Sequence, residues 1–230
     1  LENLAYHDLT SGWCTMVGTT AIASLGTFLP KTGLDRVFGS GKIPTASISF
    51  FPAGRARRDG DGYRVSGRWR FNSGIRHAEW VIGGTVIEDA EPGQPQVMFS
   101  AFPAKDVTLY DNWGGVTGLR GTGSADCSVD NYFLPKDLTF VWDLLNPAPA
   151  RGGVSYLLPP FAYVAKEHGA VALGGARREV TVLFSDVASL SELKGPAAEV
   201  LDADDLDAWA AACRRHVARP FVPRLGVGSG

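Results

Sequence analysis

The chain has 230 residues, of which 45% are hydrophobic and 20% charged, a composition typical of a globular protein with at least one sizeable core. Its formal charge of -2 creates no field that would attract nucleic acid or an anionic membrane. The apolar stretch Val154–Val164 is too short to span a bilayer, and Leu1–Thr10 lacks the basic start and apolar run of a signal peptide, so we expect a cytoplasmic protein.

The first expected element is a helix over Thr10–Leu29. Its apolar residues recur at spacings of three and four, at Trp13, Met16, Val17, Ile22, Leu25 and Phe28. Ser11 is the expected N-cap, and Pro30 is the expected stop because proline cannot continue a helix. The spacing predicts that this helix is buried.

Between Ile43 and Pro135 the helical period disappears, and short β-branched and aromatic runs alternate with turn residues. The expected strands are Ala46–Phe51, Gly62–Phe71, Trp80–Ile87, Gln96–Phe102, Val107–Trp113 and Ala125–Phe133. This pattern predicts an antiparallel β-domain, built as a small barrel or a sandwich.

One of these strands, Tyr63–Phe71, alternates strictly between apolar and polar residues. We expect Tyr63, Val65, Trp69 and Phe71 to face inward and Arg64, Arg68 and Arg70 to face outward. The preceding Asp59–Gly62 (DGDG) predicts a tight hairpin turn that pairs Ser47–Phe51 with Tyr63–Phe71. Trp80–Ile87 is apolar almost throughout, as in a strand covered on both faces.

Helical spacing returns after a loop rich in proline and glycine, Asn146–Gly153. Apolar residues and one histidine then follow a helical period over Phe161–Leu173, at Phe161, Val164, His168, Val171 and Ala172. A further amphipathic helix is expected over Leu206–Val217, with acidic residues before it and arginines near its end.

Local motifs for metal or disulfide chemistry are missing from the sequence. The histidines form no pair at metal-ligand spacing with a carboxylate, so no metal site is expected. Cys14, Cys127 and Cys213 lie far apart without a CxxC motif, and each is expected to be a small buried thiol. The seven arginines between Arg55 and Arg76 form either a solvated strand face or a site for a phosphate-bearing ligand.

Three ordered segments resemble the middle β-domain of the acyl-CoA dehydrogenase superfamily, a group of flavoproteins. They are Gly62–Gly74 (GYRVSGRWRFNSG), Gly118–Ser124 (GLRGTGS) and Val129–Pro135 (VDNYFLP). Phe51–Ala56 (FPAGRA) and the Ser-Gly turn at 73–74 are more similar to the flavin-dependent monooxygenase branch. The dehydrogenases usually carry a Thr-Glu-Pro-x-Ala-Gly-Ser-Asp stretch and a Trp-x-Thr, where this chain has FFP at 50–52 and FNS at 71–73.

The resemblance implies an α+β protein in which incomplete helical domains flank the middle β-domain. Residues 1–40 would be the end of an N-terminal helical domain, residues 41–140 the β-domain, and residues 141–230 a linker and the start of a C-terminal helical domain. After about residue 181 nothing matches the superfamily, which suggests a truncation, an excerpt or a change of frame. The full-length parent would assemble as a homo-oligomer, a tetramer.

The resemblance also implies a site for reduced FMN or FAD. Phe71 would pack against the isoalloxazine ring, Ser73 and the amides of the Gly74 turn would reach flavin N5 and O4, and Thr122 would line the same site. Core packing for Phe71 and turn capping for Ser73 remain open alternatives. His77 is the candidate catalytic residue, with a plain surface position as the alternative.

The implied function is that of an oxidoreductase, the oxygenase component of a two-component monooxygenase. Such a component would hydroxylate a small aromatic or cyclic substrate with O2 and reduced flavin, which a partner flavin reductase supplies. An acyl-CoA dehydrogenase with bound FAD is the alternative, and an inactive truncated fragment is the second alternative. The identity of the substrate does not follow from the fold, because unrelated functions share it.

Overall fold

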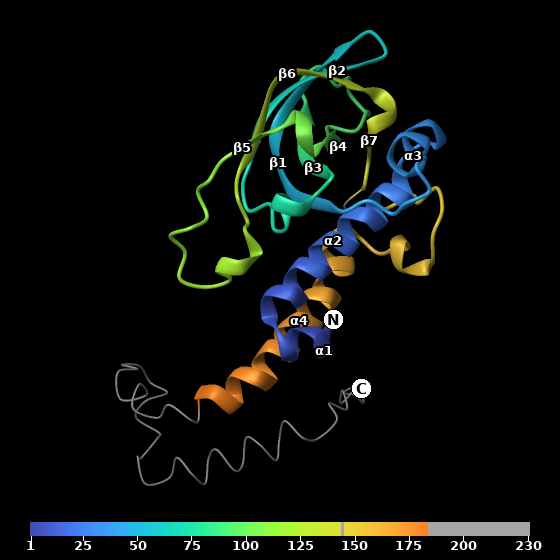
Figure 1. The fold of residues 1–230 in the computed structure, drawn as a ribbon. Helices are drawn as coiled ribbons and strands as arrows, with labels where there is room; N and C mark the ends of the chain where they lie inside the picture. The colour runs from blue at the N-terminus through green and yellow to red at the C-terminus, as the bar shows by residue number, and fades with distance from the viewer. Residues whose placement is uncertain (144, 184–230) are drawn as a thin grey trace, which may run out of the picture.

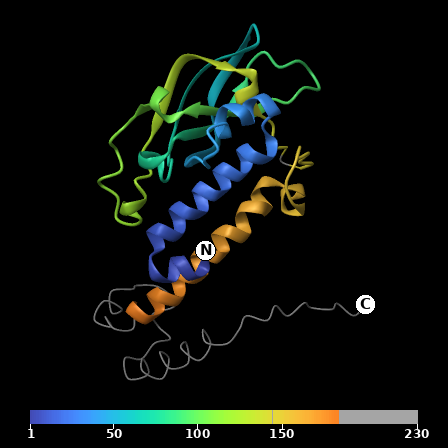
Figure 2. The same ribbon diagram turned by 45° about the vertical axis from the view of Figure 1, so that its right-hand side comes forward.

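The computed structural model describes residues 1–143 and 145–183, and for residues 178–183 it describes the backbone (Figures 1 and 2). Its helices are α1 (Glu2–His7), α2 (Leu9–Phe28), α3 (Lys31–Phe38) and α4 (Pro160–Leu183). The helix expected over Leu206–Val217 and the thiol of Cys213 lie outside the described residues. None of the described helices is both long and apolar enough to cross a membrane.

Helix α2 confirms the first predicted helix, but its N-cap differs from the expectation. The cap is Asp8, whose carboxylate accepts hydrogen bonds from the Thr10 amide at 3.0 Å and from the Ser11 hydroxyl at 2.6 Å. Ser11 therefore lies inside the first turn and donates to the cap instead of serving as one. The helix ends at Phe28, two residues before Pro30, as expected.

The strands form one seven-stranded sheet in the order β5-β6-β2-β1-β3-β4-β7. They are β1 (Ala46–Asp59), β2 (Gly62–Trp69), β3 (Trp80–Ile87), β4 (Val97–Pro103), β5 (Thr108–Leu109), β6 (Cys127–Pro135) and β7 (Thr139–Phe140). The sheet is open, with β5 and β7 at its edges, so it is neither a closed barrel nor a sandwich. The strand expected over Val107–Trp113 is reduced to the two residues of β5, and β7 was not predicted.

The pairing of β1 corrects two expectations about the sheet. The second half of β1, from Gly54 to Asp59, pairs antiparallel with Gly62–Gly67, whereas the sequence had suggested Ser47–Phe51. On its other side β1 pairs with β3 in parallel, through both Ala46–Ser49 and Gly54–Ala56, so the domain is not wholly antiparallel. The two halves are separated by an irregularity between Ser49 and Gly54. The predicted turn is confirmed, because Gly60 supplies a positive φ of 57°.

Trp69 fills the centre of the sheet and explains three of its glycines. Its side chain is fully buried, and its indole N–H donates to the Gly84 carbonyl at 2.7 Å. A Cβ at Gly54 would lie 2.5 Å from the indole ring, one at Gly83 2.3 Å, and one at Gly67 3.2 Å. Only residues without a side chain therefore leave room for this tryptophan.

Helices α2 and α4 lie side by side next to the sheet (Figures 1 and 2). Met16 of α2, Val171 of α4 and Ala5 of α1 share a small apolar cluster separate from the core of the sheet. The Thr20 hydroxyl donates to a carboxylate oxygen of Glu167 at 2.5 Å, which also ties α2 to α4. Helix α4 extends ten residues beyond the predicted end at Leu173.

Candidate functional site

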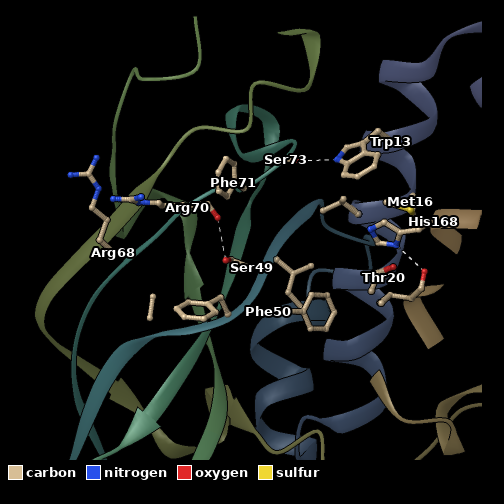
Figure 3. Close-up of a pocket in the computed structure, with 15 residues that line it drawn as sticks. Trp13, Met16, Thr20, Ser49, Phe50, Arg68, Arg70, Phe71, Ser73 and His168 are labelled. Atoms are coloured by element: carbon tan, nitrogen blue, oxygen red, sulfur yellow. Dashed lines mark hydrogen bonds between the residues drawn. The ribbon is translucent and has the colours of Figure 1, made fainter. Parts of the chain in front are cut away.

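A cavity of about 580 Å³ lies where the two helices meet the sheet (Figure 3). Four elements supply its walls: α2, the middle of β1, the end of β2 with the turn that follows it, and α4. The residues are Trp13, Met16, Val17, Thr20, Ile48, Ser49, Phe50, Phe51, Ala53, Arg68, Arg70, Phe71, Ser73, Val164 and His168. Its size and mostly apolar lining suit a small organic ligand or cofactor. A second cavity, of about 730 Å³, has none of the predicted site residues in its wall.

The turn after β2 reverses the expected orientation of Phe71. The alternation of β2 holds from Tyr63 to Arg70, with the arginines outside, but the strand ends at Trp69. Phe71 has a positive φ of 59°, and its side chain is 67% exposed, whereas the neighbouring Asn72 is buried. The prediction that Phe71 faces inward, and with it the core-packing alternative, is therefore wrong.

Phe71 instead forms part of the cavity wall. Its only described ring partner is Trp113, which meets it edge-on at a centroid distance of 5.9 Å. A non-glycine residue with positive φ is uncommon and is found where the surrounding structure holds it in place. The exposed ring is thus available to a flat ligand that enters the cavity.

The backbone of the turn is fixed by the loop before β6. The Asn72 amide N–H donates to the Ala125 carbonyl at 3.2 Å, and the Gly74 N–H donates to the Thr122 carbonyl at 2.9 Å. The side-chain amide of Asn72 donates to the Trp69 carbonyl at 2.9 Å. Gly74 has a φ of 76°, a conformation that favours glycine. A further bond of 3.3 Å joins Asn72 Nδ2 to the Ala125 carbonyl, and the Ser47 hydroxyl of β1 donates to the Ser73 carbonyl at 2.9 Å, so the turn is held from both sides.

Ser73 joins the cavity wall to a buried row of side chains. The Trp13 indole N–H donates to the Ser73 hydroxyl at 2.9 Å, as Figure 3 shows. The Ser73 and Ser124 hydroxyls are 2.7 Å apart, and those of Ser124 and Thr122 are 2.5 Å apart. The Thr122 hydroxyl donates to the Leu119 carbonyl at 2.8 Å. Helix α2, the turn after β2 and the loop before β6 thus meet through one hydrogen-bonded row.

The cluster of arginines divides between two environments. Arg57 and Arg64 pair with Glu88 and Asp59 on the solvated face of the sheet. Arg68 and Arg70 border the cavity and share one carboxylate, Asp126, at 3.0 Å and 4.0 Å. The guanidinium of Arg68 also lies over the Tyr110 ring, 4.1 Å from its centroid. No acidic residue of the described chain lines the cavity, so its charged edge is basic.

The predicted site residues separate into two groups. Phe71 and Ser73 line the cavity, whereas Gly74 and Thr122 stand behind it and shape the turn. His77 is exposed in a short 3-10 turn, Ile75–His77, and does not border the cavity. The surface alternative for His77 therefore agrees with its position.

The imidazole in the cavity wall belongs to His168, which the sequence had placed only in a helical pattern. Its Nδ1 lies 2.8 Å from the Val164 carbonyl one turn earlier. Because a carbonyl only accepts, Nδ1 carries the hydrogen of this bond, and Nε2 is the ring nitrogen left for a ligand. The ring meets Trp13 edge-on at 5.3 Å. Helical spacing alone could not reveal which residue of α4 faces a cavity formed with the sheet.

The two described cysteines offer little reactive thiolate. Burial, with a smaller contribution from the neighbouring Asp126 carboxylate, raises the pKa of Cys127 to about 12. Burial also raises the pKa of Cys14, which is only half-buried and so departs from the predicted burial. Within residues 1–143 and 145–183 no cluster of histidine, cysteine and carboxylate side chains could hold a metal ion.

Comparison with curated proteins gives relatives that include oxygenase components of flavin-dependent monooxygenases. The oxygenase subunit HsaA of a flavin-dependent monooxygenase from Rhodococcus jostii is 36% identical over 146 residues, which cover 62% of this chain and 37% of that protein. The oxygenase component of an FADH2-dependent resorcinol hydroxylase from a Rhizobium species is 36% identical over 108 residues, or 47% of this chain and 26% of that protein. No family profile matches the chain.

Among solved structures, the 3-HSA hydroxylase from Rhodococcus sp. RHA1 superposes with a TM-score of 0.74 at 22% identity. The superposition covers 94% of this chain and 56% of that chain. The chain therefore spans only part of the length of the relatives it matches. Over that part, it is homologous to the oxygenase components of flavin-dependent monooxygenases and has their acyl-CoA dehydrogenase-like fold.

Proposed function

We propose that this chain belongs to the oxygenase component of a two-component flavin-dependent monooxygenase. The component hydroxylates a small aromatic or cyclic substrate with O2 and a reduced flavin, FMN or FAD, which a partner flavin reductase supplies. The observation that carries the proposal is the wall of the cavity: an exposed aromatic ring, Phe71, lies two residues before a hydroxyl, Ser73, in an otherwise mostly apolar pocket. Homology to hydroxylases supports the choice over an acyl-CoA dehydrogenase.

The residues of the cavity fit a flavin. The Phe71 ring is fixed by a rigid turn yet open on the side of the cavity, so it can pack against the face of an isoalloxazine ring. Ser73 lines the same space, so its hydroxyl oxygen would be within reach of N5 of that ring. Arg68 and Arg70 provide positive charge at the edge for a phosphate or another anionic group.

A bound reduced flavin supplies the electrons with which O2 is split, so that one oxygen atom enters the substrate and the other leaves as water. The chain's own residues orient the flavin ring and exclude water from the cavity. Phe71 and Ser73 hold the ring, while Trp13, Met16 and Val17 of α2 form an apolar wall opposite the sheet. Exclusion of water from such a site prevents loss of the reducing equivalents as hydrogen peroxide.

His168, not His77, is the histidine placed for acid-base chemistry, because it is the one that lines the cavity. Its Nδ1 hydrogen is engaged by the Val164 carbonyl, so Nε2 is the nitrogen that can accept a proton from a ligand. A phenolic substrate in the cavity would give its proton to this nitrogen as the ring carbon becomes more nucleophilic.

The domain assignment and the assembly remain part of the proposal. Residues 41–140 correspond to the family's middle β-domain, residues 1–40 to the end of the N-terminal helical domain, and residues 141–230 to a linker and the start of the C-terminal helical domain. A homotetramer would cover the helices and complete the site.

Substitution Ser73→Ala tests the proposed function. It removes one hydrogen bond to the flavin, so reduced flavin should bind about fivefold more weakly, the equivalent of about 1 kcal/mol. With reduced flavin, O2 and a panel of simple phenols, the variant should release a larger share of the consumed O2 as hydrogen peroxide. The matched control is Ser100→Ala, because Ser100 is buried in β4 and its hydroxyl has no partner among the described residues.

Two results would contradict the proposal. One is a failure of the unaltered protein to hydroxylate any phenol while it bleaches bound FAD on addition of an acyl-CoA, which would establish the dehydrogenase alternative. The other is a failure to bind flavin in either redox state, which would favour the inactive fragment.

A further inference from the structure

We propose that the buried hydroxyls behind Ser73 form a directed relay that makes Ser73 a hydrogen-bond acceptor toward the cavity. The cavity then selects, at this point, a ligand that donates a hydrogen. The inference rests on the proposed function, because the ligand considered is flavin, and it assigns the discrimination between redox states to Ser124 and Thr122, which do not touch the cavity.

The direction of the relay follows from counting hydrogens, starting at Leu119. Its carbonyl oxygen lies 2.8 Å from the Thr122 hydroxyl and can only accept, so the one hydroxyl hydrogen of Thr122 lies between them. The contact of 2.5 Å between Thr122 and Ser124 must then be bridged by the hydrogen of Ser124. The contact of 2.7 Å between Ser124 and Ser73 must in turn be bridged by the hydrogen of Ser73.

Trp13 donates the hydrogen bond at the other end of the row, to the Ser73 oxygen. An indole N–H is a donor only, and it fills one of the two acceptor positions of the Ser73 oxygen. The Ser73 hydroxyl therefore donates its hydrogen to Ser124 and accepts a hydrogen bond from Trp13 at one of its two acceptor positions. What remains for a ligand is a single acceptor position.

The opposite direction would leave a contact without a hydrogen. If Ser73 donated into the cavity, Ser124 would have to donate to Ser73 and Thr122 to Ser124. The Thr122 and Leu119 oxygens would then face each other at 2.8 Å with no hydrogen between them. Because Thr122 is 2% and Ser124 4% exposed, water has no ready access to repair this contact.

Flavin presents opposite chemistry in its two redox states at N5. Reduced flavin carries N5–H, a donor that matches the free acceptor position of Ser73. Oxidised flavin has a bare N5, an acceptor that would meet the Ser73 oxygen without a hydrogen between them. Ser124 and Thr122 are thus positioning residues that act through Ser73, and Trp13 holds the serine from the side of α2.

Two substitutions behind the cavity wall should free the Ser73 hydrogen without changing a residue that lines the cavity. In Ser124→Ala, the Ser73 hydroxyl loses its acceptor and can turn toward a ligand. In Thr122→Val, Ser124 loses its acceptor and can donate to Ser73, which again frees the Ser73 hydrogen. Ser100→Ala removes a buried hydroxyl outside the relay and is the control.

The measurement is the equilibrium dissociation constant of FMN and of FAD, each in the oxidised form and in the reduced form under anaerobic conditions. The unaltered protein should bind the reduced form more tightly. Both relay variants should lower the ratio of oxidised to reduced dissociation constants by about fivefold, the effect of one hydrogen bond, and Ser100→Ala should not. The midpoint potential of bound flavin should fall by about 20 mV, since a tenfold change corresponds to about 30 mV for two electrons.

The outcomes separate the relay from the proposed function. If reduced flavin binds but neither variant changes the ratio, the relay is refuted and the proposed function stands. A parallel loss of both redox forms, with the ratio kept, assigns these hydroxyls a structural role and also refutes the relay. If the unaltered protein binds neither form, the proposed function fails and the relay fails with it.

Discussion

The centre of the sheet and the segment around the start of α4 differ in how completely they bury their apolar residues. Trp69, Val65 and Phe102 of the sheet are fully buried, whereas Phe161 at the start of α4 is 64% exposed and Leu157 just before it 59%. The main core is shared by the sheet, by Leu25 and Phe28 of α2 and by Tyr163 of α4, whereas the segment around the start of α4 presents apolar surface that the described residues do not cover. The cavity lies at the boundary, so a rigid sheet fixes the ligand-facing turn while a less complete layer supplies the opposite wall.

Substitution Trp69→Ala should have the largest effect, because it removes the centre of the better-packed region. We expect the free energy of unfolding to fall by about 3–5 kcal/mol, since three glycines leave a space that no other side chain can fill. Phe161→Ala, in the less complete region, should change it by no more than about 0.5 kcal/mol. Urea denaturation followed by circular dichroism measures both. Equal losses would show that the sheet is no better packed than the helices.

The two described cysteines differ in burial, so they should differ in how they make the stability of the fold depend on pH. Cys127 of β6 has a pKa of about 12 in the folded protein because burial disfavours its thiolate, whereas the unfolded thiol ionises near 9. The raised pKa stabilises the fold fully below pH 9, and this stabilisation is lost as the pH rises from 9 toward 12. The unaltered protein and Cys127→Ala differ in their free energy of unfolding. At about pH 10.5 this free energy of the unaltered protein should be about 2 kcal/mol lower, relative to that of the variant, than at pH 7.

Cys14 of α2 provides the control for this pH dependence. It is half-buried, so its pKa is raised by a weaker desolvation. Cys14→Ala should therefore alter the pH profile of unfolding less than Cys127→Ala does. A profile that is unchanged by Cys127→Ala would contradict the assignment.

The features that the sequence predicted well depend on local periodicity. Alternation located β2 and the buried face that holds Tyr63 and Trp69, and helical spacing located α2. Local glycine chemistry located the turn at Gly60. The parallel pairing of β1 with β3 joins segments that are distant in sequence, and no local pattern encodes which neighbour a buried strand chooses.

The candidate site was predictable only in part. The resemblance indicated Phe71 and Ser73, but strand alternation placed the Phe71 ring inside, because a positive φ at a non-glycine residue has no signal in the sequence. His168 was missed because the identity of the residue that faces the cavity depends on how α4 packs against α2. The hydroxyl row combines three segments of the chain, so no spacing motif describes it.

Exposed apolar side chains gather just before and at the start of α4. Their substitution should have the smallest effect on the free energy of unfolding. Val154 is 82% exposed, Leu157 59%, Leu158 41% and Phe161 64%, all within eight residues of sequence. Apolar side chains gathered in this way favour association, which agrees with the proposed tetramer. We expect the purified chain to self-associate, and the double substitution Leu157→Ser with Phe161→Ser to shift it toward the monomer in static light scattering.

The double variant should leave the free energy of unfolding of the monomer within about 0.5 kcal/mol, because exposed side chains contribute little to the fold. Ala162→Ser, a substitution at an exposed neighbour on the same helix, is the control and should leave the association unchanged. A monomer that melts cooperatively before any substitution would show that the helices need no further cover. The difference between the two regions would then be one of exposure alone, without consequence for assembly.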